Sequence, residues 1–289
     1  MRYALVSDIH ANWQAWTAVQ TDALSDGVED FICLGDVVGY GPQPARTLAD
    51  VYSRVRYLVL GNHDAVLAGR MDPACFNDTA RVSIEWTAEQ LDAKAGDFFE
   101  DLPLVLQGET FSCAHATLDA PECFDYVLEP EDALRCWAEC EEPLLFVGHT
   151  HCPGIFVVGE SGTPHSVQAQ DFVTEEHKRY VVNVGSVGQP RDGDVRASYC
   201  IFDVEQGAVL FRRVPFDLEA YKSDFTSVKC PVAAPAYLSQ PSTLQTTPVR
   251  DVLDFSPPAS VPERADSAGG DAVQTLEQAR RTLKRWRLT

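Results

Sequence analysis

Several short apolar runs in this chain are followed at once by Asp, Asn or His residues. Runs of this length and composition predict buried β-strands. Ligand sites in α/β sheets gather beyond the carboxyl ends of the strands, so we expect these polar groups to converge on one site. The runs at 3–6, 31–34, 57–60, 110–114 and 144–147 precede, in that order, Asp8-Ile9-His10, Gly35-Asp36, Gly61-Asn62-His63-Asp64, His115 and Gly148-His149-Thr150-His151.

These groups offer carboxylates, imidazoles and one amide oxygen, and no thiolate. Such ligands suit Mn, Fe, Zn, Ni or Co rather than a structural zinc site built from cysteines. The candidate ligands outnumber what one open-site ion requires, and they match two divalent ions that share a carboxylate, about 3.5–4 Å apart. They are Asp8, His10, Asp36, Asn62, His115, His149 and His151.

Residues 1 to about 217 read as one α/β unit, because strand-like runs alternate with helical stretches. Helices are expected at 13–24, 44–51 and 77–91. The number of strands after the βα repeats predicts two packed sheets with outer helices rather than one fully parallel sheet. These additional strands are expected at 154–158, 181–184, 198–203 and 208–214.

The composition changes towards the end of the chain. We expect a first domain over residues 1–222, a Pro-rich linker, extended or disordered, over 223–270, and a short basic amphipathic helix over 271–289. This helix would dock on its own acidic body, bind a partner chain or lie on an anionic membrane surface. Of these alternatives we do not expect stable membrane association. Its apolar face would consist of Leu276, Ala279, Leu283 and Trp286.

The formal net charge of −20 restricts the kinds of substrate. Nucleic-acid binding depends on Lys and Arg contacts with phosphates, so we expect no long DNA or RNA partner. A small phosphorylated substrate fits better, because bound cations reverse the field locally.

The nine cysteines, without an apolar leader, predict free thiols in a reducing compartment, the cytoplasm. Cys136 and Cys140 would share a helix face, but no second pair completes a four-ligand metal site. No run of roughly 18 apolar residues is present to span a membrane.

The ordered motifs resemble those of the calcineurin-like metallophosphoesterase superfamily, D-x-H, G-D, G-N-H-D/E, H and G-H-x-H, and every element is present. The resemblance covers residues 1 to about 217. It implies an α/β fold, a four-layer α/β/β/α sandwich with two mixed β-sheets. One departure is Ala116 after His115, where close relatives often have Gly. The segments typical of the small bacterial and archaeal branch, which includes phosphodiesterases, are 7–12, 39–42 and 183–191.

The resemblance also implies a role for each ligand, with Asp36 bridging two ions. Together the ions would lower the pKa of a shared water, giving a hydroxide that attacks the phosphate ester. The implied ligands are Asp8, His10 and His151 for the first ion, and Asn62, His115 and His149 for the second.

His63 is the candidate acid that protonates the leaving alkoxide. Asp64 would orient His63 and keep it protonated. The structural alternatives are a supporting histidine beside the ligands for His63, and a helix cap for Asp64.

Four further residues are candidates for the substrate pocket. Arg191 would grip a phosphate oxygen through two parallel hydrogen bonds, or else form a surface salt bridge. Asn12 would bind substrate or cap the helix that begins there. Tyr40 and Tyr126 would form pocket walls or pack in the core.

Three functional interpretations stay open. We favour a phosphodiesterase or broad phosphoesterase acting on a small molecule or nucleotide. A protein serine/threonine phosphatase would use the same metal ligands, so only the pocket separates these two. A non-catalytic scaffold has a precedent in a retromer subunit of this fold, although here His63 and all seven ligands are intact.

Overall fold

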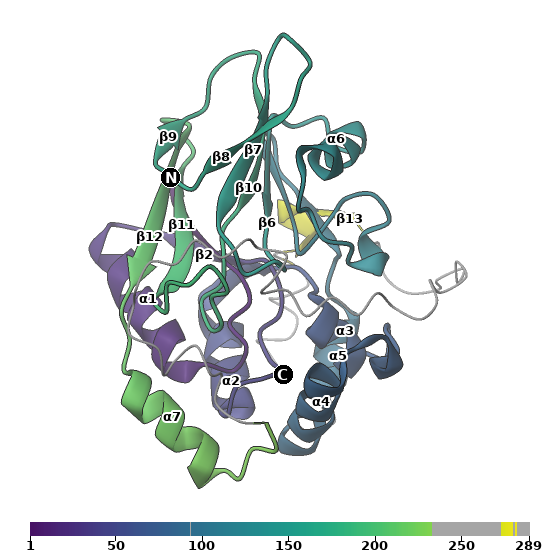
Figure 1. Ribbon diagram of the computed structural model, residues 1–289, viewed down its shortest axis with the longest axis vertical. Helices are drawn as coiled ribbons and strands as arrows, with labels where there is room; N and C mark the ends of the chain where they lie inside the picture. The colour runs from purple at the N-terminus through teal and green to yellow at the C-terminus, as the bar shows by residue number, and fades with distance from the viewer. Residues whose placement is uncertain (93, 233–272, 280, 282–289) are drawn as a thin grey trace.

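The computed structural model describes residues 1–92, 94–232, 273–279 and 281. Two mixed β-sheets pack face to face, and helices cover their outer faces (Figure 1). This arrangement confirms the expected α/β/β/α sandwich. Each sheet contains a block of three neighbouring parallel strands, and these blocks bring the carboxyl ends of strands from both sheets to one end of the molecule.

In the first sheet, β1 lies in the middle and pairs in parallel with β2 and antiparallel with β11. β2 and β3 are also parallel, whereas β12 pairs antiparallel with both its neighbours. In order across the sheet, the strands are β3 (Val55–Leu58), β2 (Asp30–Cys33), β1 (Arg2–Val6), β11 (Ala197–Asp203), β12 (Ala208–Val214) and β9 (Phe172–Val173).

In the second sheet, β5, β6 and β10 are parallel neighbours, and antiparallel pairs flank them on both sides. The edge strand β13 pairs in parallel with β4. In order across the sheet, the strands are β13 (Val273–Thr275), β4 (Val105–Gln107), β5 (Phe111–Ala114), β6 (Leu144–Val147), β10 (Arg179–Asn183), β7 (Gly154–Val158) and β8 (His165–Gln168).

The alternation of side chains along β1 explains the layers. Leu5 points into the core between the sheets, in the same cluster as Phe146 of β6. Its neighbour Val6 points to the other face, in the cluster that contains Trp16 of α1. Because both faces of the strand are covered, the run reads as continuously apolar rather than alternating.

Helices α1 (Trp13–Ser25) and α2 (Pro44–Arg54) cover the outer face of the first sheet, and α6 (Pro130–Ala138) lies against β7 of the second. No described helix is long and apolar enough to cross a membrane. The remaining helical segments are α3 (Asn62–Leu67), η1 (Pro73–Cys75), α4 (Asp78–Gln90), α5 (Lys94–Glu100), η2 (Pro121–Cys123) and α7 (Leu218–Ser227).

The expected elements differ from the structure at identifiable places. The strand expected at 57–60 is β3, which ends at Leu58 because the Leu60 N–H donates to Pro103 O outside the ladder, at 2.8 Å. The bounds of helix α6 were not predicted, although Pro130 at its first turn and Asp132, whose carboxylate accepts the Glu129 N–H, mark its start. The helix ends at Ala138, so the expectation that Cys136 and Cys140 share a helix face is wrong.

The expected linker over 223–270 lies mostly outside the described residues, and α7 occupies part of its beginning. In the final segment, three residues of the expected helix, Val273–Thr275, form the strand β13, because the edge of β4 offers backbone partners. Residues 276–279 are helical, and Ala279 is buried in the core between the sheets. All nine cysteines are free, as expected.

We expect Leu5→Ala to lower the free energy of unfolding by about 2–5 kcal/mol, because Leu5 is fully buried between the sheets and the substitution leaves a cavity. The matched control is Leu24→Ala in α1, where the leucine is 57% exposed and the change should stay within about 0.5 kcal/mol. Urea unfolding of both variants measures the difference. Equal losses would contradict this description of the core.

Candidate metal centre

All seven candidate ligands lie together, buried, beyond the carboxyl ends of parallel strands. The first sheet contributes Asp8 and His10 after β1, Asp36 after β2 and Asn62 after β3. The second contributes the rest: His115 after β5, and His149 and His151 after β6. The site therefore depends on both sheets at once.

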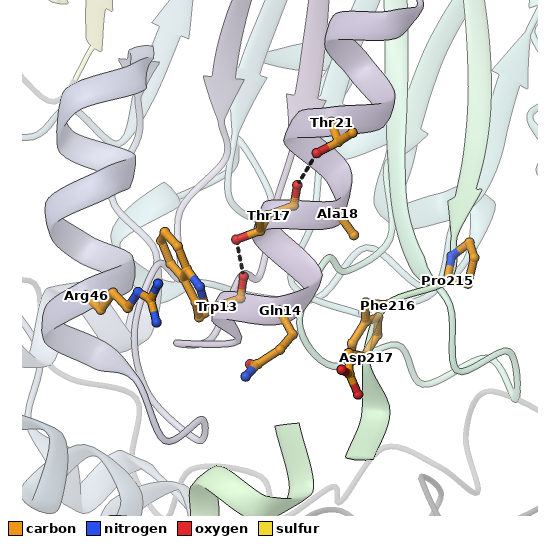
Figure 2. Close-up of a pocket in the computed structure, with 9 residues that line it drawn as sticks. All are labelled: Trp13, Gln14, Thr17, Ala18, Thr21, Arg46, Pro215, Phe216 and Asp217. Atoms are coloured by element: carbon orange, nitrogen blue, oxygen red, sulfur yellow. Dashed lines mark hydrogen bonds between the residues drawn. The ribbon is translucent and has the colours of Figure 1, made fainter. Parts of the chain in front are cut away.

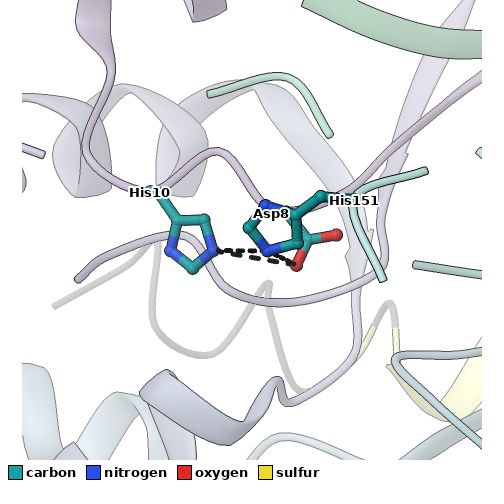
Figure 3. A group of neighbouring side chains, drawn as sticks. All are labelled: Asp8, His10 and His151. Atoms are coloured by element: carbon teal, nitrogen blue, oxygen red, sulfur yellow. Dashed lines mark hydrogen bonds and ion pairs between the residues drawn. The ribbon is translucent and has the colours of Figure 1, made fainter. Parts of the chain in front are cut away.

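One group of donors consists of Asp8, His10 and His151, whose polar atoms face one another (Figure 3). His151 Nε2 lies 3.3 Å from Asp8 Oδ1 and 3.2 Å from His10 Nε2. Asp8 Oδ1 is buried and has no hydrogen-bond partner among the described residues. A buried, unpartnered carboxylate oxygen between two imidazole nitrogens suits a divalent cation.

A second group forms around His115. Its Nε2 lies 3.1 Å from Asn62 Oδ1 and 3.1 Å from His149 Nδ1. Because the Nδ1–H of His115 donates to Leu34 O, its Nε2 carries a lone pair and cannot donate to Asn62 Oδ1, so these two acceptors face each other without a proton between them. They fit a second cation.

Asp36 lies between the two groups. Its Oδ2 is 3.6 Å from His10 Nε2 and 3.5 Å from His115 Nε2. Its other oxygen, Oδ1, accepts the His63 N–H at 2.9 Å, which fixes the orientation of the carboxylate. This is the position that a bridging ligand would occupy.

Backbone carbonyls set the orientation of three ligand histidines. Nδ1 of His10, His115 and His151 lies 3.0, 2.7 and 2.6 Å from the carbonyl oxygens of Val38, Leu34 and Gln189. Because each Nδ1–H donates outwards, each Nε2 presents a lone pair to the centre.

His149 is the exception, because its Nδ1 faces inwards. Its ring stacks on Tyr126 with 4.1 Å between centroids and 12° between planes. Tyr126 therefore lies at the site and supports a ligand. From the sequence, Tyr126 was expected only as a pocket wall or a core residue.

Burial lowers the pKa of all four ligand histidines below the usual value, which keeps them neutral and ready to bind cations. Burial raises the pKa of Asp36, and the charges of Asp64 and Asp8 raise it further. A cation held between the groups would offset both effects on Asp36.

The backbone at the site is strained. Five candidate ligands have left-handed φ values, which residues other than glycine seldom adopt. Such residues cost about 1–3 kcal/mol each and cluster at functional sites. The φ values are 53° for Asp8, 46° for His10, 54° for Asp36, 67° for His149 and 60° for His151.

The segment 183–191 joins the ligand-bearing loops of the two sheets. Val187 and Gly188 donate their N–H groups to the carbonyls of Ser7 and Asp8 at 3.0 and 2.9 Å. The Asn183 amide donates to Gly148 O, next to His149. From the sequence, this segment stood out only as a family feature, because nothing in its spacing indicates which loops it connects.

His63 lies beside the centre, where it forms a third group of donors with His10 and Asp36. Its ring packs between those of Tyr40 and Phe76, at 4.7 and 4.6 Å, and its buried Nδ1 has no hydrogen-bond partner among the described residues. Burial lowers the pKa of His63.

Asp64 does not orient His63. Its carboxylate accepts the N–H groups of Val37 and Gly61, at 3.1 and 3.4 Å, and so caps the start of α3, whose N-cap residue is Gly61. The helix-cap alternative is the one that the structure shows. Burial raises the pKa of this carboxyl to about 7.

Asn12 also acts as a cap. Its side-chain oxygen accepts the Ala15 N–H at 3.0 Å, and its amide donates to Gly188 O at 2.9 Å, so its polar atoms are engaged within the protein. Of the two alternatives considered for Asn12, the structure shows the cap, together with a tie to the segment 183–191.

Arg191 and Tyr40 lie together at the site. The Arg191 guanidinium sits 5.7 Å from the centroid of the Tyr40 ring and donates to Gln189 Oε1 at 2.7 Å. Arg191 forms no ion pair with any described carboxylate within 4.0 Å, so the surface salt-bridge alternative is not seen. The Tyr40 ring also contacts His10, at 4.9 Å between centroids. The remaining histidines, His165 and His177, are exposed.

A groove of about 620 Å³ lies elsewhere, between α1, the start of α2 and the segment before α7 (Figure 2). Arg46 lies over the Trp13 ring there, at 4.0 Å from its centroid, and Phe216 lines the opposite side. None of the candidate ligands lines this groove.

Known proteins resemble this chain over most of its length. A model described as the calcineurin-like phosphoesterase superfamily domain matches residues 1–207. An uncharacterized protein of Methanocaldococcus jannaschii is 34% identical over 221 residues, 75% of this chain and 88% of that protein. The crystal structure of a metallophosphoesterase from Sphaerobacter thermophilus is 34% identical, covers 83% of this chain and 97% of its own, and has a TM-score of 0.69. A hypothetical protein from Pyrococcus horikoshii shares the fold at 20% identity, over 82% and 95% of the two chains, with a TM-score of 0.63.

We expect Gly188→Ala to lower the metal content of the purified protein, because a Cβ at Gly188 would collide with the Ile9 carbonyl and displace the loop between Asp8 and His10. The matched control is Gly154→Ala, where a Cβ would meet no atom within 4 Å. Elemental analysis after dialysis against manganese measures the bound ions. Equal metal content in the two variants would contradict the close packing described for this loop.

Proposed function

This chain belongs to the calcineurin-like phosphoesterase superfamily, and on that premise we propose that it is a metal-dependent hydrolase of phosphate esters. The observation that carries the proposal is the position of Asp36 Oδ2, between His10 and His115 of the two donor groups. A carboxylate in this place suits a site for two divalent ions that share one ligand.

We propose that Asp8, His10 and His151 hold one ion, that Asn62, His115 and His149 hold the other, and that Asp36 contacts both. Ions of Mn, Fe, Zn, Ni or Co suit these donors. When bound, they supply an acidified water and positive charge beside the phosphate oxygens. Three of the histidines are oriented for this role by the backbone carbonyls that accept from their Nδ1–H groups.

The protein's own contribution to phosphate binding is Arg191. Its guanidinium has no carboxylate partner among the described residues, so it keeps donors for a phosphate oxygen. The packing of Tyr40 against it limits the positions that the guanidinium adopts. Two parallel hydrogen bonds from Arg191 would orient the ester for attack.

We propose His63 as the proton donor to the leaving oxygen. Its Nδ1 is buried without a hydrogen-bond partner among the described residues, and the side chain lies with His10 and Asp36 at the centre, where its ring would meet the substrate. Burial lowers its pKa in the free protein. The negative charge of a bound phosphate would favour the protonated ring.

The proposed substrate is a small phosphorylated molecule or nucleotide, as a diester or a monoester. A protein serine/threonine phosphatase and a scaffold without turnover are the alternatives, since both would use the same ligands. We further propose a cytoplasmic location, which the nine free thiols support. The tail after residue 270 would serve self-docking or a partner chain, and Ala279 in the core between the sheets supports the former.

We expect manganese-dependent hydrolysis of bis(p-nitrophenyl) phosphate or p-nitrophenyl phosphate, and at least about a 100-fold loss of kcat/KM in Asp36→Asn, because one ligand is shared by both ions. His165→Ala, at an exposed histidine, is the matched control and should keep full activity. The preferred ester separates phosphodiesterase from phosphatase. Two bound ions with no turnover of either ester, under manganese, nickel, zinc or iron, would favour the scaffold instead.

We expect His63→Asn to lower kcat by about 100-fold while metal content stays unchanged, because general-acid catalysis contributes factors of that order. The loss should be smaller for p-nitrophenyl esters than for alkyl esters, since p-nitrophenolate leaves without a proton. His177→Asn is the control, at a histidine whose side chain is 67% exposed. Equal losses for both kinds of ester would contradict the assignment of His63 as the acid.

A further inference from the structure

The loop that carries Arg191 continues as a charged run with two aspartates, Asp192 and Asp194, followed by Arg196. Within it, Arg196 pairs with Asp194, with 2.6 Å from Nη2 to Oδ2. Asp192 pairs with Arg213 of β12, and this pair fastens the loop to a strand of the first sheet. Among the charged residues of this loop, Arg191 differs from the others, because no carboxylate of the described residues lies within 4.0 Å of its guanidinium.

The position of Arg191 depends on the conformation of this loop. Its N–H donates to the carbonyl of the ligand His151 at 3.2 Å, and its guanidinium donates to Gln189 Oε1. Neither contact restrains the chain on the far side of Arg191. That restraint comes from the next residue, Asp192, through its ion pair with Arg213.

Arg213 is well placed to restrain the loop. It lies within β12, opposite Ser198 of β11, and also donates to the Arg196 carbonyl at 3.4 Å. One guanidinium therefore holds both ends of the segment 192–196. The side chains of Asp192 and Arg213 are only 24% and 20% exposed, so solvent screens this pair less than a fully exposed one.

We propose that Asp192 and Arg213 are positioning residues for Arg191, which hold its guanidinium where it meets the phosphate group of the substrate. This inference rests on the proposed function, in that Arg191 binds phosphate. Misplacement of a binding group by about 1 Å weakens catalysis strongly. Loss of the Asp192 charge would release the loop and displace Arg191 without removing any metal ligand.

The test is Asp192→Asn, which keeps the shape of the side chain and removes its charge. We expect KM to rise by about ten-fold, kcat to change by less than about three-fold, and metal content to stay the same. The matched control is Asp26→Asn, which weakens the pair of Asp26 with Arg212, the neighbouring residue of β12, at 2.9 Å. This control should leave KM unchanged, and an equal rise in KM in both variants would overturn the proposal.

A double-mutant cycle shows whether Asp192 acts through Arg191. In an Arg191→Gln background, Asp192→Asn should raise KM by less than about two-fold, because the group that it positions is gone. A ten-fold rise in both backgrounds would overturn the proposal. Arg213→Lys keeps the positive charge that Arg213→Gln removes. KM should therefore rise less in Arg213→Lys than in Arg213→Gln.

Binding of inorganic phosphate distinguishes a failure of this inference from a failure of the proposed function. If the manganese-loaded protein hydrolyses neither ester, isothermal titration with inorganic phosphate replaces KM as the readout. Binding that weakens by about ten-fold in Asp192→Asn, and not in Asp26→Asn, would support the positioning role without turnover. Phosphate binding that is absent in the wild type, or unchanged in Asp192→Asn, would overturn it.

Discussion

The burial of two carboxylates among neutral histidines is the constraint on which the rest of the structure depends. Asp8 and Asp36 are 0% and 1% exposed, and an ionised carboxylate held away from water is costly unless positive charge compensates it. Burial lowers the pKa of the surrounding histidines, so they do not supply that charge. Divalent cations are the compensation that these donors suit. The two sheets must therefore keep their strand ends close enough for ligands from both to converge.

The convergence of the candidate ligands was predictable because each is local to a strand end. Asp8, Asp36 and His149 follow β1, β2 and β6 by two or three residues, and hydrophobic runs mark those strands clearly. Most strands and the longer helices could be placed for the same reason. The strands that were not predicted are short ones such as β4 and β13. Three residues are too few to show the hydrophobic pattern of a strand.

Interactions between distant parts of the chain could not be predicted in this way. Asp64 caps α3 and also accepts from Val37, and this second contact, 27 residues away, decides that the carboxylate does not face His63. The amide of Asn12 is engaged by Gly188, 176 residues later. Spacing shows which side chains are available at a strand end. The hydrogen-bond partners of these side chains depend on how the sheets pack, because several donors and acceptors from distant parts of the chain lie near each one.

The local charge at the centre also bears on the size of the substrate. The chain has a net charge of −20, which repels anions, but this repulsion is screened beyond about 10 Å at moderate salt. Bound cations and Arg191 act at shorter range, inside the site. We infer that a small phosphate ester responds mainly to the positive charge at the centre, whereas a long polyanion must also lie along the acidic surface. We expect discrimination against long nucleic acids from this contrast between the acidic surface and the centre.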